Sequence, residues 1–227
     1  MLKQAQTRLG ASFTQLYGLT ETVGGGTYLP AEDHDPARGR LRSCGKAYPG
    51  FEIKVVDGDG KTVETGAVGE ILIRAAAVMK GYWNKPDATA KSVVDGWFYS
   101  GDAGYFDAEG YLYIHDRVKD MIVSGGENVY PAEVENAIFS HPAVADAAVI
   151  GVPDERWGEA VKAVVVLKPG AEADAAALIA HCRERIAGYK TPKSVDFIDA
   201  LPRNPSGKVL RRELRKPYWE GKGRLVG

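Results

Sequence analysis

The chain has 227 residues, and its 29 Lys and Arg side chains against 30 Asp and Glu side chains give a formal net charge of -1. This balance excludes a global attraction to nucleic acid or to anionic lipid. Hydrophobic residues make up 44% and charged residues 26% of the chain, a composition typical of globular proteins rather than disordered or membrane-spanning ones. The 27 glycines make up about 12% of the 227 residues, above the usual share of ~7%. This surplus indicates many turns or close backbone approaches.

The cysteines and the N-terminal residues favour a reducing, cytoplasmic setting. Cys44 and Cys182 lie far apart without a CxxC pairing, and the four histidines add no metal-ligand spacing. The first residues have neither a signal-peptide nor a transit-peptide pattern, and the longest apolar runs are shorter than the roughly 18 residues of a membrane span. Cys182 falls in the apolar stripe of a predicted helix, so we interpret it as a core residue rather than a nucleophile.

The first part of the chain is predicted to contain turns and then short strands. Residues 1–50 are rich in glycine, proline and acidic residues, so we expect a surface of turns there and no core. The elements that follow are predicted as strands at 51–56 and 69–74 joined through a turn at 57–60, a helix capped by Asn84 and ending near Val94, and strands starting at Trp97 and Tyr111.

The pattern changes after Arg117, where we place a domain boundary. The elements predicted beyond it are a helix from Pro131, strands at 145–150 and 161–167, a helix capped by Asp174, a strand at 195–198 and a short basic helix at 209–214. The predicted fold class is therefore α+β. Residues 1–117 are predicted to contain hairpins or a small barrel segment, and residues 118–227 a compact α+β module with a short sheet flanked by helices.

Two motifs in the first domain have both a structural and a chemical interpretation. The run at 17–21 reads YGLTE, which fits a turn followed by a helix cap, but it also gathers an aromatic ring, a hydroxyl and a carboxylate. The run at 99–102 reads YSGD, and its carboxylate, Asp102, can either cap a turn or accept two hydrogen bonds from a ribose diol.

Two further motifs lie beyond the predicted boundary or at it. Residues 116–120 read DRVKD and residues 124–133 read SGGENVYPAE, a glycine loop that allows close approach to a ligand before a helix starts. Residues 202–211 read PRNPSGKVLR, a loop that presents Lys208 as a point charge suited to a phosphate or carboxylate. The basic residues after Lys208 fit a solvated tail. A nucleic-acid-binding module would interleave aromatic residues with the basic ones, and this stretch does not.

In this order, and together with GEI at 69–71 and MKGYW at 79–83, the four motifs resemble the C-terminal part of the adenylate-forming enzymes. This superfamily contains acyl-CoA synthetases, peptide-synthetase adenylation domains and luciferases. The resemblance implies that ATP activates a carboxylic acid to an acyl-adenylate, from which coenzyme A then takes the acyl group as a thioester. The hinge and the glycine loop look like those of coenzyme A ligases rather than of peptide-synthetase modules. The lead hypothesis is an acyl-CoA synthetase that acts on a medium or long-chain fatty acid. An aromatic or short-chain acid stays an alternative.

The resemblance also implies a role for each motif residue. The nucleotide-binding residues would be Tyr17, Gly18, Thr20, Asp102, Arg117 and Lys208. In the family the aromatic at Tyr17 packs against adenine, Thr20 meets the α-phosphate as a catalytic residue, Glu21 helps hold Mg²⁺, and Asp102 takes the ribose hydroxyls. An oxygen ligand such as Glu21 suits a hard divalent ion that keeps water and substrate phosphates in its other positions.

The remaining roles implied by the resemblance concern the second domain. Arg117 would lie near the ribose and phosphate, and Lys208 would be the catalytic residue that bridges the substrate carboxylate and the α-phosphate. Lys119 occupies the position of the hinge about which the small domain turns between the two half-reactions. In the second orientation the loop at Ser124, Gly125 and Gly126 would line the path of the pantetheine arm of coenzyme A.

Two parts of the family pattern are missing from the 227 residues, namely the phosphate-wrapping loop and the upstream domain that forms most of the acyl pocket. The resemblance therefore implies that the chain is roughly the last two-fifths of an enzyme. Residues 1–117 would be the partial, β-barrel-like C-terminal end of its large AMP-binding domain, and residues 118–227 its small mobile domain. A second hypothesis is that the isolated chain is a non-catalytic module with weak AMP or coenzyme A binding. The expected partners are a small carboxylic acid, ATP and coenzyme A, with no nucleic acid. The identity of the acid, peripheral membrane contact and oligomeric state stay open.

Overall fold

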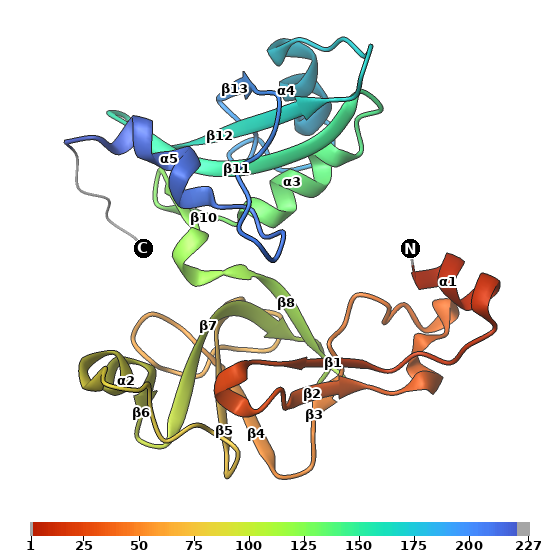
Figure 1. Ribbon diagram of the computed structural model, residues 1–227, viewed down its shortest axis with the longest axis vertical. Coiled ribbons are helices and arrows are strands. Elements are labelled where there is room, and N and C mark those ends of the chain that lie inside the picture. The colour runs from red at the N-terminus through yellow and green to blue at the C-terminus, as the bar shows by residue number, and fades with distance from the viewer. Residues whose placement is uncertain (1, 222–227) are drawn as a thin grey trace. The chain divides into compact units, whose positions relative to one another are not determined.

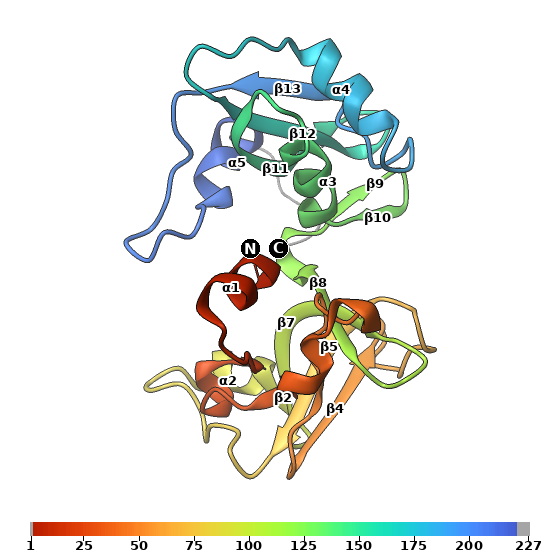
Figure 2. The same cartoon turned by 90° about the vertical axis from the view of Figure 1, so that its right-hand side faces the viewer.

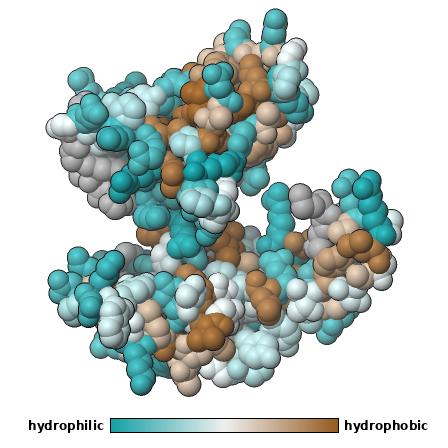
Figure 3. Space-filling view, viewed as in Figure 1, coloured by the Kyte–Doolittle hydropathy of each residue, from teal (hydrophilic) through white to brown (hydrophobic). Residues whose placement is uncertain are grey.

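The computed structural model describes residues 2–221. Two compact units divide the chain, Met1–His115 and Asp116–Gly227, which we call unit 1 and unit 2. The division lies two residues before the boundary predicted after Arg117. Residue 1 and residues 222–227, which the predicted domains include, lie outside the described residues. No helix among the described residues is long and apolar enough to cross a membrane, and hydrophilic residues border the hydrophobic patches visible in Figure 3.

Unit 1 consists mainly of short strands (Figure 1). Its helices and strands are α1 (Leu2–Leu9), β1 (Gln15–Gly18), β2 (Gly26–Leu29), β3 (Lys46–Ala47), β4 (Phe51–Val56), β5 (Gly69–Ala75), α2 (Pro86–Ser92), β6 (Val93–Val94), β7 (Trp97–Phe106) and β8 (Leu112–Arg117), whose last two residues belong to unit 2. The order β4-β5-β7-β6, with β8 paired to β7, makes a curled sheet. The predicted pair at 51–56 and 69–74 is confirmed as β4 and β5, which are antiparallel from Phe51↔Ala75 to Val56↔Glu70.

The prediction of a turn-only surface for residues 1–50 is wrong. Strands β1, β2 and β3 form a three-stranded sheet there, and Leu29 is completely buried. Tyr17 and Leu19 pack against the apolar cluster around Ile71 in the curled sheet. The strands have only two to four residues and contain glycine, so they are too short for an alternating pattern to be recognised.

The predicted cap of the helix α2 is also wrong in detail. The residue before the helix is Lys85, which makes no side-chain capping bond, and Asn84 has a left-handed backbone with φ of 53°. Pro86 at the first helical position is compatible with the helix because its missing N–H has no partner in the first turn. Asn84 therefore turns the chain into the helix rather than capping it.

Unit 2 is one sheet covered on both faces. Its elements are the 3-10 helix η4 (Val118–Asp120), β9 (Ile122–Ser124), β10 (Glu127–Val129), α3 (Pro131–Phe139), β11 (Val144–Asp154), β12 (Gly158–Leu167), α4 (Ala175–Arg183), β13 (Ser194–Phe197) and α5 (Arg211–Trp219). The strand order is β10-β9-β12-β11, and β13 adds to β12 in parallel. The helices from Pro131 and after Asp174 are confirmed, and the Asp174 side chain accepts a hydrogen bond from the Ala177 N–H.

Alternation along β11 and β12 explains the two covered faces. Val149 and Val165 point into a cluster with α3 and α4, which includes the fully buried Cys182, so its predicted core position is confirmed. Ile150 and Val164 point into the opposite cluster, where residues of α5 pack. Figure 2 shows α3 and α5 on opposite sides of these strands. Successive side chains of a strand point to opposite faces of the sheet, so the continuous apolar runs of β11 and β12 place buried apolar side chains on both faces. The predicted α+β fold class, with a curled sheet followed by a helix-flanked sheet, is confirmed.

Candidate functional site

Tyr17 and Asp102, 85 residues apart in sequence, meet in unit 1. The Tyr17 hydroxyl donates a 2.9 Å hydrogen bond to Asp102 Oδ2. Burial, followed by the charge of Asp102, raises the pKa of Tyr17, so the phenol remains a neutral donor. Asp102 is itself buried, and its backbone N–H donates to Ser100 Oγ at 3.0 Å. The pair joins the YGLTE and YSGD motifs and fixes a carboxylate beside the aromatic ring.

A second carboxylate, Glu70, lies in the same region. The Gly101 N–H donates to Glu70 Oε1 at 3.0 Å. Burial raises the pKa of Glu70, and the charge of Asp102 adds to this effect. Glu70 belongs to the GEI run, for which no role was predicted from the sequence. Its bond to the Gly101 N–H fixes the irregular part of β7 that precedes Asp102.

Glu21 is positioned by the MKGYW run. The Tyr82 hydroxyl donates to Glu21 Oε1 at 2.8 Å, and the Met79 N–H donates to the Glu21 carbonyl at 2.7 Å. Burial, followed by the hydrogen bond to Glu21, raises the pKa of Tyr82. Sequence reasoning missed this positioning role of Tyr82, and nothing in the sequence relates positions 61 residues apart. Thr20, beside Glu21, is exposed at the start of the 3-10 helix η1 (Thr20–Thr22).

Glu21 alone can supply one ligand to a metal. Among the described residues, no group of three or more His, Cys, Asp or Glu side chains is arranged to hold an ion. Mg²⁺ is commonly held by one or two carboxylates and completes its octahedron with water and substrate phosphates. The carboxylate of Glu21 therefore fits a magnesium ion as one of its oxygen ligands.

Gly18 occupies a position where any side chain would clash with the backbone of the neighbouring turn. A Cβ atom built on Gly18 would lie 2.2 Å from the carbonyl oxygen of Gly24. This contact brings the turn after η1 directly against β1. The glycine is therefore required for the shape of the YGLTE segment whether or not a ligand binds there.

At the start of unit 2, Asp116 holds the chain beside Arg117. Its carboxylate accepts bonds from the Arg117 N–H and from the Ala132 N–H, both at 2.7 Å. Ala132 lies in the first turn of α3, where backbone N–H groups have no partner within the helix. In this chain the carboxylate serves as a distant cap of α3 and fixes the backbone at Arg117.

The glycine loop is a tight hairpin packed on Trp157. Gly125 and Gly126 connect β9 to β10 with φ of 62° and 86°, the left-handed values that a two-residue hairpin turn requires. The Gly125 N–H donates to the Trp157 carbonyl at 2.9 Å, and a Cβ on Gly125 would lie 2.6 Å from a Trp157 ring atom. Ser124 is buried at the base of this hairpin. Sequence reasoning missed Trp157, which forms one wall of the loop.

Lys208 lies on an exposed hairpin that is hydrogen-bonded within itself. Asn204 accepts from the Lys208 N–H at 2.8 Å through its side chain, and its own N–H donates to the Lys208 carbonyl at 2.9 Å. Arg203 donates to the Gly207 carbonyl at 2.6 Å. The backbone that carries Lys208 is therefore ordered, while the side chain is exposed to solvent.

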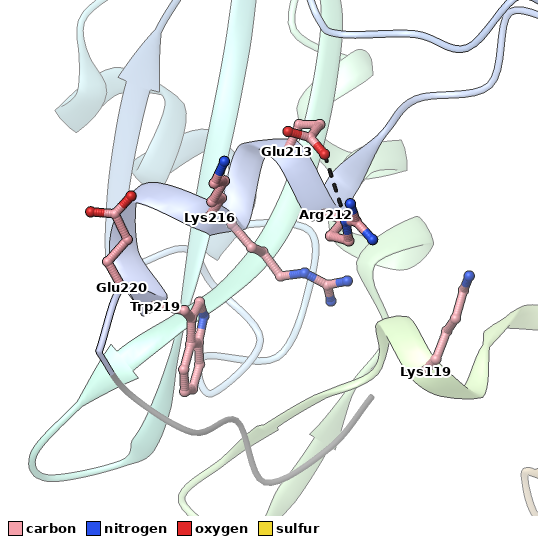
Figure 4. Close-up of a pocket in the computed structure, with 7 residues that line it drawn as sticks. Lys119, Arg212, Glu213, Lys216, Trp219 and Glu220 are labelled. Carbon is pink, nitrogen blue, oxygen red and sulfur yellow. Dashed lines mark ion pairs between the residues drawn. The ribbon is translucent and has the colours of Figure 1, made fainter.

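Lys119 lies in η4 and lines a pocket beside α5 (Figure 4). The pocket has a volume of about 600 Å³, and its lining residues are Lys119, Arg212, Glu213, Arg215, Lys216, Trp219 and Glu220. The Trp219 indole donates to the Gly151 carbonyl at 2.9 Å, which fixes one wall. Arg212 pairs with Glu213 at 3.6 Å, and Arg215 pairs with Asp120 at 3.4 Å. These acidic partners already compensate part of the positive charge of the pocket.

The predicted site residues thus form two groups. In unit 1 a hydrogen bond joins Tyr17 to Asp102, and Gly18, Thr20 and Glu21 follow Tyr17 directly in the chain. Unit 2 contains Arg117, Lys119, Ser124, Gly125, Gly126 and Lys208 on its first turn and two hairpins. The ligand roles implied by the resemblance stay predictions.

Comparison with known proteins matches the chain to two family models. The model of the AMP-binding enzymes matches residues 1–83, and the model of the AMP-binding enzyme C-terminal domain matches residues 133–208. Among curated relatives, the fatty acid–[acyl-carrier-protein] ligase ScoC of Streptomyces coeruleorubidus is 47% identical over 100% of this chain and 44% of its own length. The medium/long-chain-fatty-acid–CoA ligase FadD8 of Mycobacterium tuberculosis is 44% identical over 100% of this chain and 40% of its own.

A solved structure gives the same result. The o-succinylbenzoate CoA synthetase MenE of Bacillus subtilis, in complex with its acyl-adenylate intermediate, has a TM-score of 0.85 and 42% identity over 94% of this chain and 43% of its own. The chain belongs to the family of AMP-binding, adenylate-forming enzymes. It spans less than half the length of the relatives named here.

Proposed function

We propose that the protein carrying this chain activates a carboxylic acid with ATP and transfers the acyl group to the thiol of coenzyme A. The observation that supports this most is the hydrogen-bonded pair of Tyr17 and Asp102, because it joins two motifs that the adenylate-forming family uses for one nucleotide. The likeness to ScoC, FadD8 and MenE supports the same reaction class.

In the first half-reaction, a carboxylate oxygen of the acid attacks the α-phosphorus of ATP, and pyrophosphate leaves. We assign the adenine to the ring of Tyr17, the ribose hydroxyls to Asp102 and the α-phosphate to the Thr20 hydroxyl. Glu21, held by Tyr82, offers an oxygen to the magnesium that accompanies the phosphates. Lys208 is assigned to the negative charge that develops between the carboxylate and the α-phosphate.

In the second half-reaction, the thiolate sulfur attacks the acyl carbon, and AMP leaves with the electrons of the broken C–O bond. We assign the pivot between the two steps to Lys119 and the path of the pantetheine arm to the loop at Ser124, Gly125 and Gly126. The packing of Gly125 on Trp157 supports this assignment, because it keeps the loop narrow and its backbone exposed.

We propose a medium or long-chain fatty acid as the substrate, supported by the likeness to FadD8. The similar likeness to MenE makes an aromatic acid the alternative. ScoC is named for an acyl carrier protein, so a carrier-protein thiol is a second candidate acceptor. Because the chain spans 40–44% of ScoC and FadD8, we propose that these 227 residues alone bind AMP or coenzyme A weakly and do not turn over.

ATP–pyrophosphate exchange with a panel of acids tests this proposal. The complete protein should catalyse exchange that depends on magnesium and is fastest with a fatty acid of medium or long chain. The 227-residue chain should give no exchange above the reaction without acid. Exchange with an aromatic acid only would transfer the substrate assignment to the alternative. No exchange with any acid by the complete protein would contradict the proposed function, and turnover by the chain alone would contradict the inactive-module proposal.

A further inference from the structure

Arg211 lies at the centre of a charged network that the proposed mechanism does not use. It is the first residue of α5, three residues after Lys208. Its Nη2 donates to both carboxylate oxygens of Glu135 on α3, at 2.8 and 2.9 Å, and its Nη1 reaches Asp120 of η4 at 3.4 Å. One guanidinium therefore joins α5, α3 and the segment that follows the hinge position Lys119.

The acidic partners of Arg211 have further contacts that fix them. Asp120 also pairs with Arg215, one helical turn along α5, at 3.4 Å. Glu135 Oε1 accepts a 2.8 Å bond from the Val149 N–H of β11, in the core of the sheet. Burial raises the pKa of Glu135, and the charge of Arg211 opposes this rise. The network thus extends from η4 to the centre of unit 2.

Stability alone does not account for this arrangement. Buried ion pairs are often no more stable than apolar residues of similar volume, because desolvation offsets their attraction. The buried Arg211 Nε has no hydrogen-bond partner among the described residues, which is a further cost. The network instead restricts the orientation of the guanidinium, because its two terminal nitrogens bind carboxylates on two different elements, Glu135 of α3 and Asp120 of η4.

The Lys208 hairpin ends directly at this fixed point. The Leu210 N–H donates to the Pro202 carbonyl at 2.8 Å and closes the base of the hairpin. The next residue is Arg211. A hairpin closed on itself keeps its internal shape, but its direction depends on what its base is attached to. In this chain the base is attached through Arg211 to α3 and η4.

We propose that Arg211 is a positioning residue that holds the Lys208 hairpin and the post-hinge residue Asp120 in one rigid body. Rotation about the hinge then moves the Lys208 hairpin without changing its position relative to Asp120. The pivot lies on the N-terminal side of Asp120. This inference rests on the proposed roles of Lys208 and Lys119. The rigidity itself does not require them, so it is measurable without any substrate.

Amide hydrogen exchange of the 227-residue chain tests the rigidity. Arg211→Met should speed exchange of amides in both 119–123 and 204–210 by roughly tenfold or more, because it leaves the buried Glu135 without its charged partner and removes the link from α5 through Arg211 to Asp120, which then keeps only Arg215 among the described ion pairs. Arg212→Met is the matched control, since the Arg212 side chain is 89% exposed and pairs only with the neighbouring Glu213 among the described ion pairs. It should leave exchange in both segments unchanged. Arg211→Lys should restore part of the protection.

A second comparison separates positioning from general destabilisation. Val165→Ala, in the buried core of β12, should speed exchange across unit 2 without preference for the two segments. If Arg211→Met gives that same uniform pattern, or leaves either segment as protected as in the parent chain, the proposal is overturned. In the complete protein, Arg211→Met should lower kcat of adenylation with little change in KM for ATP. If amide hydrogen exchange in the two segments does not respond to Arg211→Met as expected, the positioning role is refuted. If the unsubstituted complete protein shows no ATP–pyrophosphate exchange, the proposed function is refuted instead.

Discussion

Replacement of Gly125 by alanine should destabilise unit 2 more than the same replacement of Gly126. Both glycines have left-handed backbones, which cost an L-residue roughly 1–2 kcal/mol. At Gly126 nothing lies within 4 Å of the added Cβ, so the backbone cost is the whole effect. At Gly125 the Cβ would lie 2.6 Å from a Trp157 ring atom, an overlap that adds about 1–3 kcal/mol as overpacking does.

Several features of Trp157 set the size of this difference. Its backbone carbonyl accepts the Gly125 N–H at 2.9 Å, so the backbone around the ring cannot move away freely. The Trp157 residue is 38% exposed and its ring can yield by rotation, which favours the lower part of the range. We therefore expect Gly125→Ala to be about 1–2 kcal/mol less stable than Gly126→Ala.

Urea unfolding of the two variants, followed by circular dichroism, measures this difference. Adding Trp157→Ala to each variant completes the comparison, because removal of the ring should cancel the extra cost of Gly125→Ala and leave the cost of Gly126→Ala unchanged. Equal stability of Gly125→Ala and Gly126→Ala would refute the reasoning. So would an unchanged difference after the ring is removed, because the cost would then not come from the contact.

Three further predictions concern other parts of the chain. Asp116→Ala should lower the stability of unit 2 by about 1 kcal/mol in thermal unfolding, because the Ala132 N–H loses its acceptor; unchanged stability would show that Asp116 does not cap α3. The hydrogen bond from Tyr111, with those from arginines, lowers the pKa of Asp33 below 3.8, so the stability it contributes is complete above pH 3.8 and lost as pH falls through the lowered pKa. Asp33→Asn should reduce this loss of stability at acid pH, and an unchanged dependence of the unfolding free energy on pH would contradict the prediction. In the complete protein, Lys119→Pro should slow thioester formation more than adenylation, and equal slowing would place the pivot elsewhere.

The fold of unit 2 was largely predictable because its signals are local. Pro131 and Asp174 mark the starts of α3 and α4, and the apolar runs of β11 and β12 are long enough to be recognised as strands. The strands β1, β2 and β3 were missed because two to four residues contain no measurable alternation. What local sequence determines was therefore predicted, and what depends on tertiary pairing was not.

The candidate site shows the same limit. Motif residues such as Tyr17 and Asp102 were identified individually, but the bond between them depends on how β1 and β7 come together. Tyr82 lies within the MKGYW run, but its role was not predictable, because its contact with Glu21 spans 61 residues. The role of Asp116 likewise depends on tertiary structure, because its carboxylate accepts a hydrogen bond from Ala132, 16 residues away in the sequence.

The most direct test of the proposed chemistry is the Lys208→Ala variant of the complete protein, measured in each half-reaction separately. Acyl-adenylate formation should fall by about 10² or more, because the variant loses the charge that stabilises the transition state. Thioester formation from supplied acyl-adenylate should stay close to that of the parent protein. Arg212→Ala, a nearby exposed cation, should leave both rates unchanged. Equal loss of both half-reactions in Lys208→Ala, or retention of adenylate formation, would contradict the account.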